Sequence, residues 1–332
     1  MNDIEKNRLQ RLTKIFESNF KITRLYAEYL ERYPEVISEE MINALTDDGS
    51  ISKEEALVAI LSELFALDFD NPEDRVIIRD YLTPSVRLLD AQKYINNPYY
   101  KNIRLKDLKD GNWEIRMEEY PPYRGVICDD MIISDDFREI PPLGFFTETF
   151  PFPAILENGN EWMTLTPVDL DTCEEPIAVA HGKVVTFGLG LGYYAYMVSQ
   201  KENVESVTVV ELSEDVIRLF KNHILPQMPN AHKIKIVNMD AFEYAEKIMP
   251  GEGFDVAFVD TWRDASDGAP MYEKMKALEH YSKDTKFLYW IENFLRSRLR
   301  AIKFSEQIEA IESGSENAPK SYEDLKKSLE LI

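Results

Sequence analysis

The sequence of 332 residues has few cysteines, few histidines and no long apolar run. Its two cysteines, Cys128 and Cys173, are too few for a disulfide framework and have no metal-ligand spacing. We therefore expect a protein of the reducing cytoplasm, and no metal. The four histidines form no ligand or triad pattern. No stretch reaches the roughly 18 apolar residues of a membrane span, and no signal-peptide core is recognisable, so we expect no membrane contact.

Positive charge is also scarce. The 38 Lys and Arg residues are outnumbered by 60 Asp and Glu residues, which gives a formal net charge of −22. Such a surface repels phosphates, so it argues against a nucleic-acid partner and leaves a small molecule as the expected one. A basic run, Arg296, Arg298, Arg300 and Lys303, has near-helical spacing and predicts a solvated helix face. The sequence does not indicate an oligomeric state.

The pattern along the chain changes three times, which predicts four regions. Residues 1–95 repeat apolar positions at helical steps, and residues 96–165 have short β-like pieces separated by turns. Residues 166–293 alternate apolar runs with helical ones, and residues 294–332 form a polar, helical tail. Within the β-rich module, the step Asn158-Gly159-Asn160 predicts a hairpin, and we predict a loop for "NNPYY", residues 96–100.

The third region contains five candidate strands. They are "KVVTFG", "SVTVVE", "IKIVNMD", "FDVAFVD" and "TKFLYWIE", with helical segments between them. Alternation of buried strands and helices is typical of a doubly wound, mainly parallel sheet. We therefore predict an α/β fold, preceded by the helical segment and the small β-rich module.

Three glycines follow the first of these strands, in "VVTFGLGLGYYAYMVS". Gly188, Gly190 and Gly192 lie where a parallel sheet brings backbone close to a ligand. A dinucleotide fingerprint would need glycine in place of Tyr193. The Gly-x-Gly-x-Gly spacing instead resembles the cofactor loop of class I S-adenosylmethionine-dependent methyltransferases and of their relatives, the spermidine-synthase-like aminopropyltransferases. This resemblance implies a Rossmann-like methyltransferase core in which a side chain would exclude the nucleoside.

The resemblance also implies roles for residues at three later strand ends. Glu211, 19 residues after the last glycine, would accept the ribose hydroxyls. Asp240 would bind the adenine amine, and Ala241 and Phe242 would lie against the ring. Asp260 would lie at the catalytic edge.

The chain departs from the family at one position of the first strand. Thr186 stands two residues before the first glycine, where the family commonly has an acidic residue that helps to hold the cofactor's amino group. Aromatic side chains that could form the pocket wall are Tyr193, Tyr194, Trp162 and Trp262, although core packing is the commoner role of such residues.

The resemblance predicts an S-adenosylmethionine-dependent methyltransferase acting on an unidentified small-molecule or protein acceptor. Asp260, Glu292 and Asn293 resemble the metal ligands of catechol-type O-methyltransferases, but "DTWRD" has Arg263 where that family has a lysine base. Two alternatives remain open. One is a spermidine-synthase-like aminopropyltransferase, in which an Asp ending the fourth strand deprotonates a polyamine. The other is a non-catalytic interaction protein that retains a cofactor site.

Overall fold

The computed structural model describes residues 2–105 and 108–332, and the chain divides into two compact units. Unit 1 comprises Met1–Leu89, Pro121–Glu148 and Asn293–Ile332, and unit 2 comprises Asp90–Tyr120 and Thr149–Glu292. Both units are built from segments that are far apart in the sequence. The two units therefore divide the chain differently from the four consecutive regions that the sequence predicts. The residues of the expected β-rich module, for example, are shared between both units. The four regions stay a prediction.

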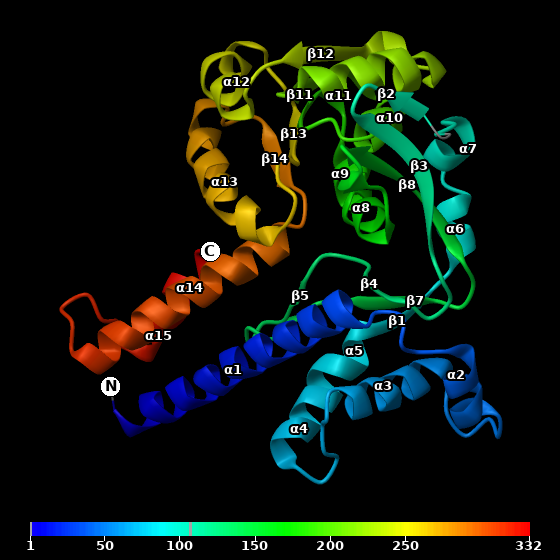
Figure 1. Ribbon diagram of the computed structural model, residues 1–332. Helices are drawn as coiled ribbons and strands as arrows, with labels where there is room; N and C mark the ends of the chain where they lie inside the picture. Colours follow the sequence, from blue (N-terminus) through cyan, green and yellow to red (C-terminus); the bar gives the residue numbers. More distant parts are fainter. Residues whose placement is uncertain (1, 106–107) are drawn as a thin grey trace. The chain divides into compact units, whose positions relative to one another are not determined.

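Unit 1 is mainly helical, with two small sheets (Figure 1). Its helices are α1 (Asp3–Arg32), α2 (Glu39–Thr46), α3 (Lys53–Leu64), α4 (Pro72–Ile77), the π-helix η1 (Ile78–Leu82), α5 (Thr83–Ser85), α14 (Glu292–Ser313) and α15 (Tyr322–Glu330). Its strands are β1 (Val86–Leu89), β4 (Gly125–Ile127) and β7 (Leu143–Phe146) in one sheet, and β5 (Ile132–Ile133) and β6 (Glu139–Ile140) in the other.

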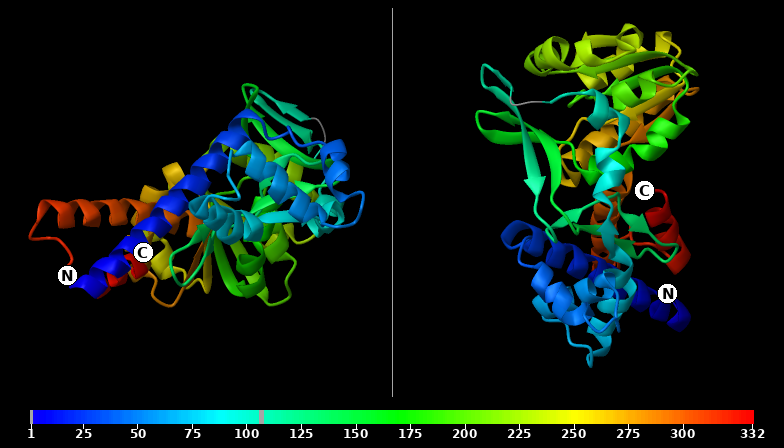
Figure 2. Two further views of the ribbon diagram at one scale, coloured as in Figure 1. Left: turned by 90° about the horizontal axis from the view of Figure 1, so that it is seen from below. Right: turned by 90° about the vertical axis from the view of Figure 1, so that its right-hand side faces the viewer.

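The long helix α1 begins at a capping box, in which the Asn2 side chain and Glu5 bond each other's backbone N–H groups. Its buried positions recur at helical steps and serve two cores. Near the C-terminal end, Tyr26 and Tyr29 pack with α3 residues, whereas in the N-terminal half Phe16 stacks on Phe304 of α14 at 3.9 Å between ring centroids. Helix α15 packs beside the same end of α1 (Figure 2). The N- and C-terminal segments thus share one core.

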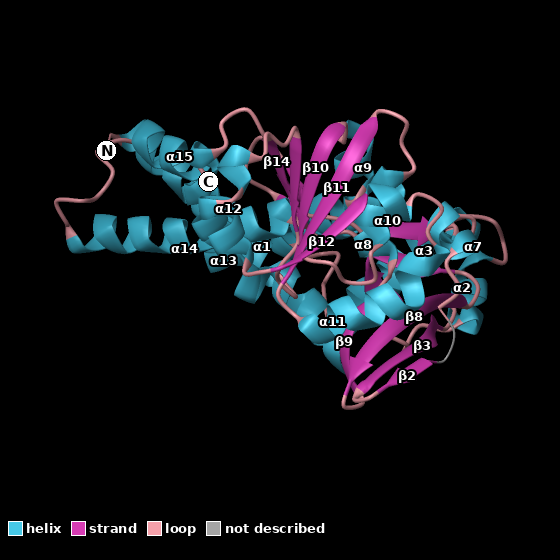
Figure 3. Cartoon of the chain, turned by 90° about the horizontal axis from the view of Figure 1, so that it is seen from above, coloured by secondary structure: helices cyan, strands magenta, loops and turns pink. Residues whose placement is uncertain are grey.

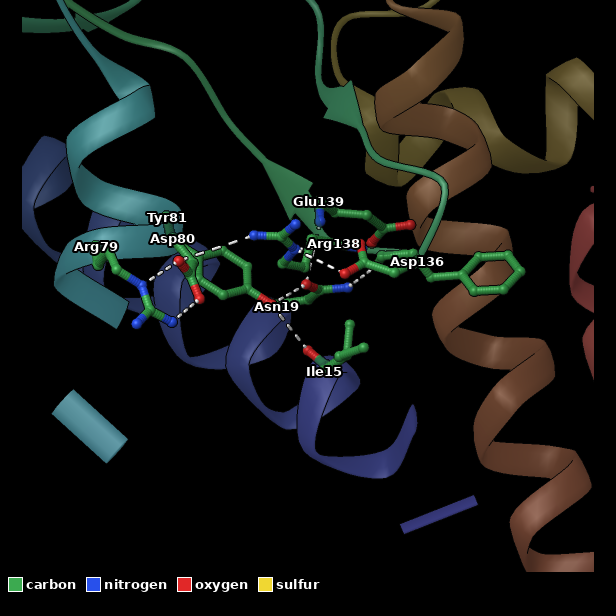
Figure 4. A network of polar contacts seen from close by, with 9 residues as sticks. Ile15, Asn19, Arg79, Asp80, Tyr81, Asp136, Arg138 and Glu139 are labelled. Atoms are coloured by element: carbon green, nitrogen blue, oxygen red, sulfur yellow. Dashed lines mark hydrogen bonds and ion pairs between the residues drawn. The ribbon is translucent and has the colours of Figure 1, made fainter. Parts of the chain in front are cut away.

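A buried polar network joins α1 to η1 and to the turn before β6 (Figure 4). The Asn19 side chain donates to the Phe137 carbonyl at 2.8 Å and accepts from the Tyr81 hydroxyl at 3.0 Å and from the Glu139 amide at 3.1 Å. Burial raises the pKa of Tyr81 above its ordinary value, which keeps the hydroxyl a donor. The amide of Asn19 thereby satisfies three groups from different segments, as a buried polar residue must.

The basic run on α14 departs from the predicted solvated face. Arg298 is exposed, but Arg300 is only 2 % exposed and pairs with the buried carboxylate of Glu139. Ser297 donates a further hydrogen bond to Glu139 at 2.7 Å. The prediction was wrong at Arg300 because sequence spacing does not reveal that a buried acid lies opposite one position of the run.

Unit 2 contains a parallel sheet with helices on both faces (Figures 1 and 3). The strands are β10 (Gly182–Phe187), β11 (Val204–Glu211), β12 (Ile234–Asn238), β13 (Val256–Val259) and β14 (Lys286–Tyr289), in the order β12-β11-β10-β13-β14, with every pair parallel. The helices are α8 (Pro167–Thr172), α9 (Glu174–Val179), α10 (Tyr193–Ser199), α11 (Glu214–Leu219), α12 (Ala241–Lys247) and α13 (Ala265–Leu278). All five predicted strands are confirmed, and the fold is Rossmann-like.

A separate antiparallel sheet precedes this core in the chain of unit 2. Its strands are β2 (Leu108–Asp110), β3 (Trp113–Tyr120), β8 (Phe150–Glu157) and β9 (Asn160–Thr164). The hairpin predicted at Asn158-Gly159 joins β8 to β9, with positive φ at both residues. Short helices α6 (Ala91–Ile95) and α7 (Pro98–Asn102) precede these strands, so the predicted loop at residues 96–100 is wrong in part. In the part of the chain that the structure describes, no helix combines the length and apolarity needed to cross a membrane.

Candidate active site

The carboxyl ends of the parallel strands open into one cavity of about 680 Å³. Parallel strands end at the same edge of a sheet, so residues that are distant in sequence converge there. Gly188 follows β10, Glu211 ends β11, Asp240 follows β12 and Asp260 follows β13, and all four line this cavity. Gly190, Ala241 and Phe242 also line it. Seven of the eight predicted site residues therefore lie around one space.

In the glycine loop, a side chain in place of glycine would collide with other protein atoms. Gly188 has φ of +98°, and a Cβ there would lie 1.9 Å from the carbonyl oxygen of Asp260. A Cβ on Gly190 would lie 2.5 Å from the sulfur of Met163. A side chain at Gly188 would therefore displace the end of β13 and move the Asp260 carboxyl away from its place in the cavity.

Gly192 is the predicted site residue that does not line the cavity. It precedes α10 with φ of +74°, and a Cβ there would lie 2.3 Å from the Phe220 ring. The contacts of Gly192 therefore concern the packing of α10 on the π-helix at Phe220–Ile224, and not the cavity.

The carboxylate of Glu211 is held in place by two backbone amides. Its Oε2 accepts from the Leu189 amide in the glycine loop at 3.0 Å, and its Oε1 accepts from the Ser213 amide at 2.7 Å. The residue is 9 % exposed. Each carboxylate oxygen can accept more than one hydrogen bond, so a ligand hydroxyl can still bind there.

Asp240 and Phe242 form the next part of the wall. Asp240 caps α12, because its Oδ1 accepts from the Glu243 amide at 2.9 Å. The Lys274 ammonium lies 3.8 Å from the centroid of the Phe242 ring, a cation–π contact that orients the ring. This part of the cavity therefore offers a fixed carboxylate beside an aromatic surface.

Asp260 has a second carboxyl group, Asp169, as its electrostatic neighbour in the cavity. Burial, and then the charges of Asp169 and Glu211, raise the pKa of Asp260 to about 8. Burial raises the pKa of Asp169 to about 6, against the opposing effect of hydrogen bonds from Thr166. Two carboxyls in one cavity, with pKa values near neutrality, are suited to accept or hold a proton.

Sequence reasoning missed Asp169, Thr261 and Trp290, which also line the cavity. A signal for Asp169 was present in "TPVD", because Thr166 and Asp169 form a capping box that fixes the acid at the start of α8. Trp290 directly follows β14, where the sheet contributes its last strand end. Nothing in the sequence alone distinguishes Thr261 and Trp290 from core residues.

The predicted aromatic candidates divide between two spaces. Trp162 and Trp262 line the large cavity, and Tyr193 and Tyr194 line a second cavity of about 30 Å³. Asp169 and Asp260 line both cavities, and Thr186 lines the smaller one. The smaller space is large enough for one or two water molecules, on the usual requirement of roughly 10 to 15 Å³ for each.

The partners of Glu292 and Asn293 lie elsewhere. Glu292 accepts from the Tyr272 hydroxyl at 2.7 Å, and the Asn293 side chain donates to the Met131 carbonyl at 3.0 Å. Neither residue lines the large cavity. Among the described residues, no group of three or more His, Cys, Asp or Glu side chains could hold a metal ion. The metal-ligand resemblance therefore has no counterpart around Asp260.

Helix α7 supports the glycine loop from the side. The Tyr99 hydroxyl donates to the Leu191 carbonyl at 2.6 Å, and the Asn97 side chain donates to the Tyr193 hydroxyl at 3.0 Å. Asn97 also caps α7 by accepting from the Tyr99 amide. Part of the segment predicted as a loop is thus a short helix, and polar groups of this segment fix the geometry of the glycine loop.

Part of this chain is similar to known proteins. The spermine/spermidine synthase domain matches residues 176–284, about a third of the chain, and this match favours a transferase. A protein from Klebsiella pneumoniae, provisionally named an O-methyltransferase, is 15% identical with a TM-score of 0.25, over 32% of this chain and 47% of its own. The spermidine synthase from Thermotoga maritima is 16% identical with a TM-score of 0.31, over 60% of this chain and 72% of its own. Both TM-scores lie below 0.5, so neither likeness bears on the function of this chain. Among curated proteins there is no match.

Proposed function

We propose that unit 2 transfers an aminopropyl group from decarboxylated S-adenosylmethionine to an amine acceptor. The observation that carries the proposal is the pair of cavity carboxyls, Asp169 and Asp260, whose pKa values are raised to about 6 and about 8. An amine acceptor must lose a proton as it reacts, and a carboxylate with a pKa near neutrality can accept it. The spermine/spermidine synthase match supports this reading over methyl transfer.

The cavity residues fit such a nucleoside. Under the proposal the Glu211 carboxylate accepts from the ribose hydroxyls and the Asp240 carboxylate accepts from the adenine amine; both residues line the cavity. Phe242 and Ala241 offer the apolar surface for the ring. A volume of about 680 Å³ lies within the roughly 300 to 1,000 Å³ of small-molecule sites, so it can take a nucleoside and a small acceptor together.

Under this proposal, two residues of the chain have different roles in the reaction. Once bound, the cofactor supplies a carbon activated by its sulfonium, so that the new nitrogen–carbon bond forms while the carbon–sulfur bond breaks and its electron pair stays on sulfur. Asp260 accepts the proton from the acceptor nitrogen. Burial, and after it the charge of Asp169, hold the pKa of Asp260 high enough for that transfer, because burial disfavours the charged form and two nearby carboxylates resist simultaneous ionisation.

The first test is calorimetric titration with methylthioadenosine, which lacks the amino-acid tail, and with S-adenosylhomocysteine, which has it. Under the proposal methylthioadenosine binds more tightly, because Thr186 stands where related proteins use an acid to hold the amino group of that tail. Tighter binding of S-adenosylhomocysteine would instead support S-adenosylmethionine and methyl transfer. If neither ligand binds, the result would support the alternative hypothesis of a non-catalytic interaction protein.

Glu211→Ala is expected to weaken methylthioadenosine binding by about 1 to 3 kcal/mol, because the ribose hydroxyls lose their acceptor. Calorimetry on both proteins measures the difference. Glu214→Ala is a matched control: Glu214 is exposed in the first turn of α11 and does not line the cavity. An equal affinity of Glu211→Ala and the parent protein would contradict the ribose assignment.

A further inference from the structure

Unit 1 contains a groove of about 800 Å³ that is lined by α1, α4, η1 and the turn between β5 and β6 (Figure 4). Its charged lining residues are Arg11, Lys14, Arg79, Asp80, Asp136 and Arg138. Four basic side chains against two acidic ones give the lining a net charge of +2, on a chain whose net charge is −22. The groove is therefore a local exception to the acidic character of this protein.

Both acidic residues of the groove are already paired with arginines. Asp80 accepts from Nε and Nη2 of Arg79 at 2.6 Å and 2.7 Å, and Asp136 accepts from Nε of Arg138 at 2.9 Å. Asp80 also lies 3.9 Å from the Arg138 guanidinium. These contacts orient the two arginines, and they engage both of the carboxylates that line the groove.

Arg11 and Lys14 carry the charge that is left over. They lie three residues apart on α1, so they share one face of the helix, and both are exposed. Lys21, further along α1, pairs with Asp74 of α4 at 2.6 Å. In the part of the chain that the structure describes, neither Arg11 nor Lys14 has such a partner. Both are therefore accessible cations that can bind an anionic group without breaking an existing pair.

The groove also offers apolar surface. Ile15 and Val76 line it, and each is only partly buried at the edge of one of the cores of unit 1. A second hollow of about 410 Å³ continues the groove, because Val76 and Arg79 line both. Phe69 lines this second hollow and is 56 % exposed. Apolar surface that is bordered by charged residues is typical of a binding site.

This combination favours a short acidic peptide over other anions. Nucleic acid or an anionic membrane would reach beyond the groove and meet the acidic surface of a chain with net charge −22. For a short peptide the local charge decides, because exposed charges more than about 8 Å apart are largely screened at physiological ionic strength. A small anion such as phosphate would pair with the cations but would leave the apolar surface uncovered. A peptide can bind both.

We infer that this groove docks an acidic peptide segment of a partner protein. The carboxylates of the peptide bind Arg11 and Lys14, and an apolar side chain packs on Ile15 and Val76. The groove belongs to unit 1 and shares no lining residue with the large cavity, so the inference does not depend on the proposed transfer. The ion pair between α1 and α4 holds two sides of the groove together before a peptide binds, which lowers the cost of binding.

The test is a selection from a display library of random linear peptides on the full-length protein. We expect the enriched peptides to carry an excess of Asp and Glu next to an apolar residue. Labelled with a fluorophore and titrated by anisotropy, they should bind Arg11→Gln/Lys14→Gln about three- to tenfold more weakly than the parent protein, the scale of two exposed ion pairs. Lys6→Gln/Arg24→Gln is the matched control. It removes the same charge from exposed positions of α1 outside the groove, and its affinity should equal the parent's.

Several outcomes would overturn the inference. Enrichment of no peptide, or of peptides without an acidic excess, would contradict the chemistry of the partner. Equal affinity of Arg11→Gln/Lys14→Gln and the parent protein would place the peptides elsewhere. Tighter binding of inorganic phosphate than of any enriched peptide, lost in the same variant, would assign the cations to a phosphate group. A dimer of the parent protein in analytical ultracentrifugation that this variant does not form would assign the groove to a second copy of the chain.

Discussion

Asp260→Asn is expected to lower kcat/KM for transfer to an amine by about 10²- to 10⁴-fold, the usual contribution of a general base. Asparagine keeps the shape of the side chain and cannot accept the proton. The assay follows release of methylthioadenosine from decarboxylated S-adenosylmethionine. Methylthioadenosine affinity should stay close to that of the parent, because the assigned nucleoside contacts lie on other strand ends. A variant with parental kcat/KM would remove Asp260 from the mechanism.

The pH dependence follows from the same carboxyl. A base acts in its deprotonated form, so kcat/KM should rise with pH and level off above the pKa of Asp260, about 8 in the free protein. Asp169→Asn removes a neighbouring negative charge that raises this pKa, so the rise should move to lower pH. The amine of the substrate also titrates, but its pKa does not depend on residue 169. If the pH profile of kcat/KM is the same in Asp169→Asn as in the parent protein, the rise reflects titration of the substrate amine and not of Asp260.

Stability measurements separate a lost base from a damaged fold. A folded-state pKa of about 8 lies above the unfolded value near 3.8, so the stabilising effect of the neutral carboxyl is complete at low pH and is lost as pH rises through 8. Asp260→Asn cannot ionise and should escape that loss. Its thermal midpoint should exceed the parent's at pH 8.5 and approach it at pH 4. A lower midpoint at both values would mean that the substitution disturbs the packing.

Much of the Rossmann-like sheet was predictable because its signals are local. Each of the five strands is a short apolar run between polar segments, and a buried parallel strand requires that pattern. The places of Glu211, Asp240 and Asp260 follow once the strands are recognised, because parallel strands end at one edge. The pairing of Asp169 with Asp260 was not predictable, since it depends on where α8 lies against that edge.

In the glycine loop, too, the backbone conformation could be predicted from the local sequence, whereas the contacts with distant residues could not. Its positive φ angles are a local demand, and three alternating glycines signal them. What each missing side chain makes room for is a distant contact: the Asp260 carbonyl at Gly188 and the Phe220 ring at Gly192. The resemblance assigned all three glycines to a ligand, and that assignment stays a prediction; in the structure a Cβ at each of them would also meet protein atoms, so the protein's own packing requires glycine there.

The basic run of α14 is a second case, and it leads to the largest expected effect on stability. Arg300 and Glu139 are both buried, with side chains 3 % and 4 % exposed, and they bond directly to each other. Burial raises the pKa of Glu139 against the opposing effects of its partners Ser297 and Arg300. Arg300→Met would leave that carboxylate buried without a cation. Removing one partner of a buried pair typically costs about 3 to 5 kcal/mol of unfolding free energy.

Urea unfolding at two pH values tests the cause of this loss. Without Arg300 the folded pKa of Glu139 rises further above its unfolded value, so stability is retained below the unfolded pKa and lost as pH rises through the folded one. The deficit of Arg300→Met should therefore be larger at pH 7 than at pH 4, and Glu139→Gln/Arg300→Met should recover most of it at pH 7. Arg298→Met, at an exposed position of the same helix, should stay within about 0.5 kcal/mol of the parent. A deficit that is equal at both pH values, with no recovery in the double variant, would mean that Arg300 stabilises unit 1 through packing and not through its charge.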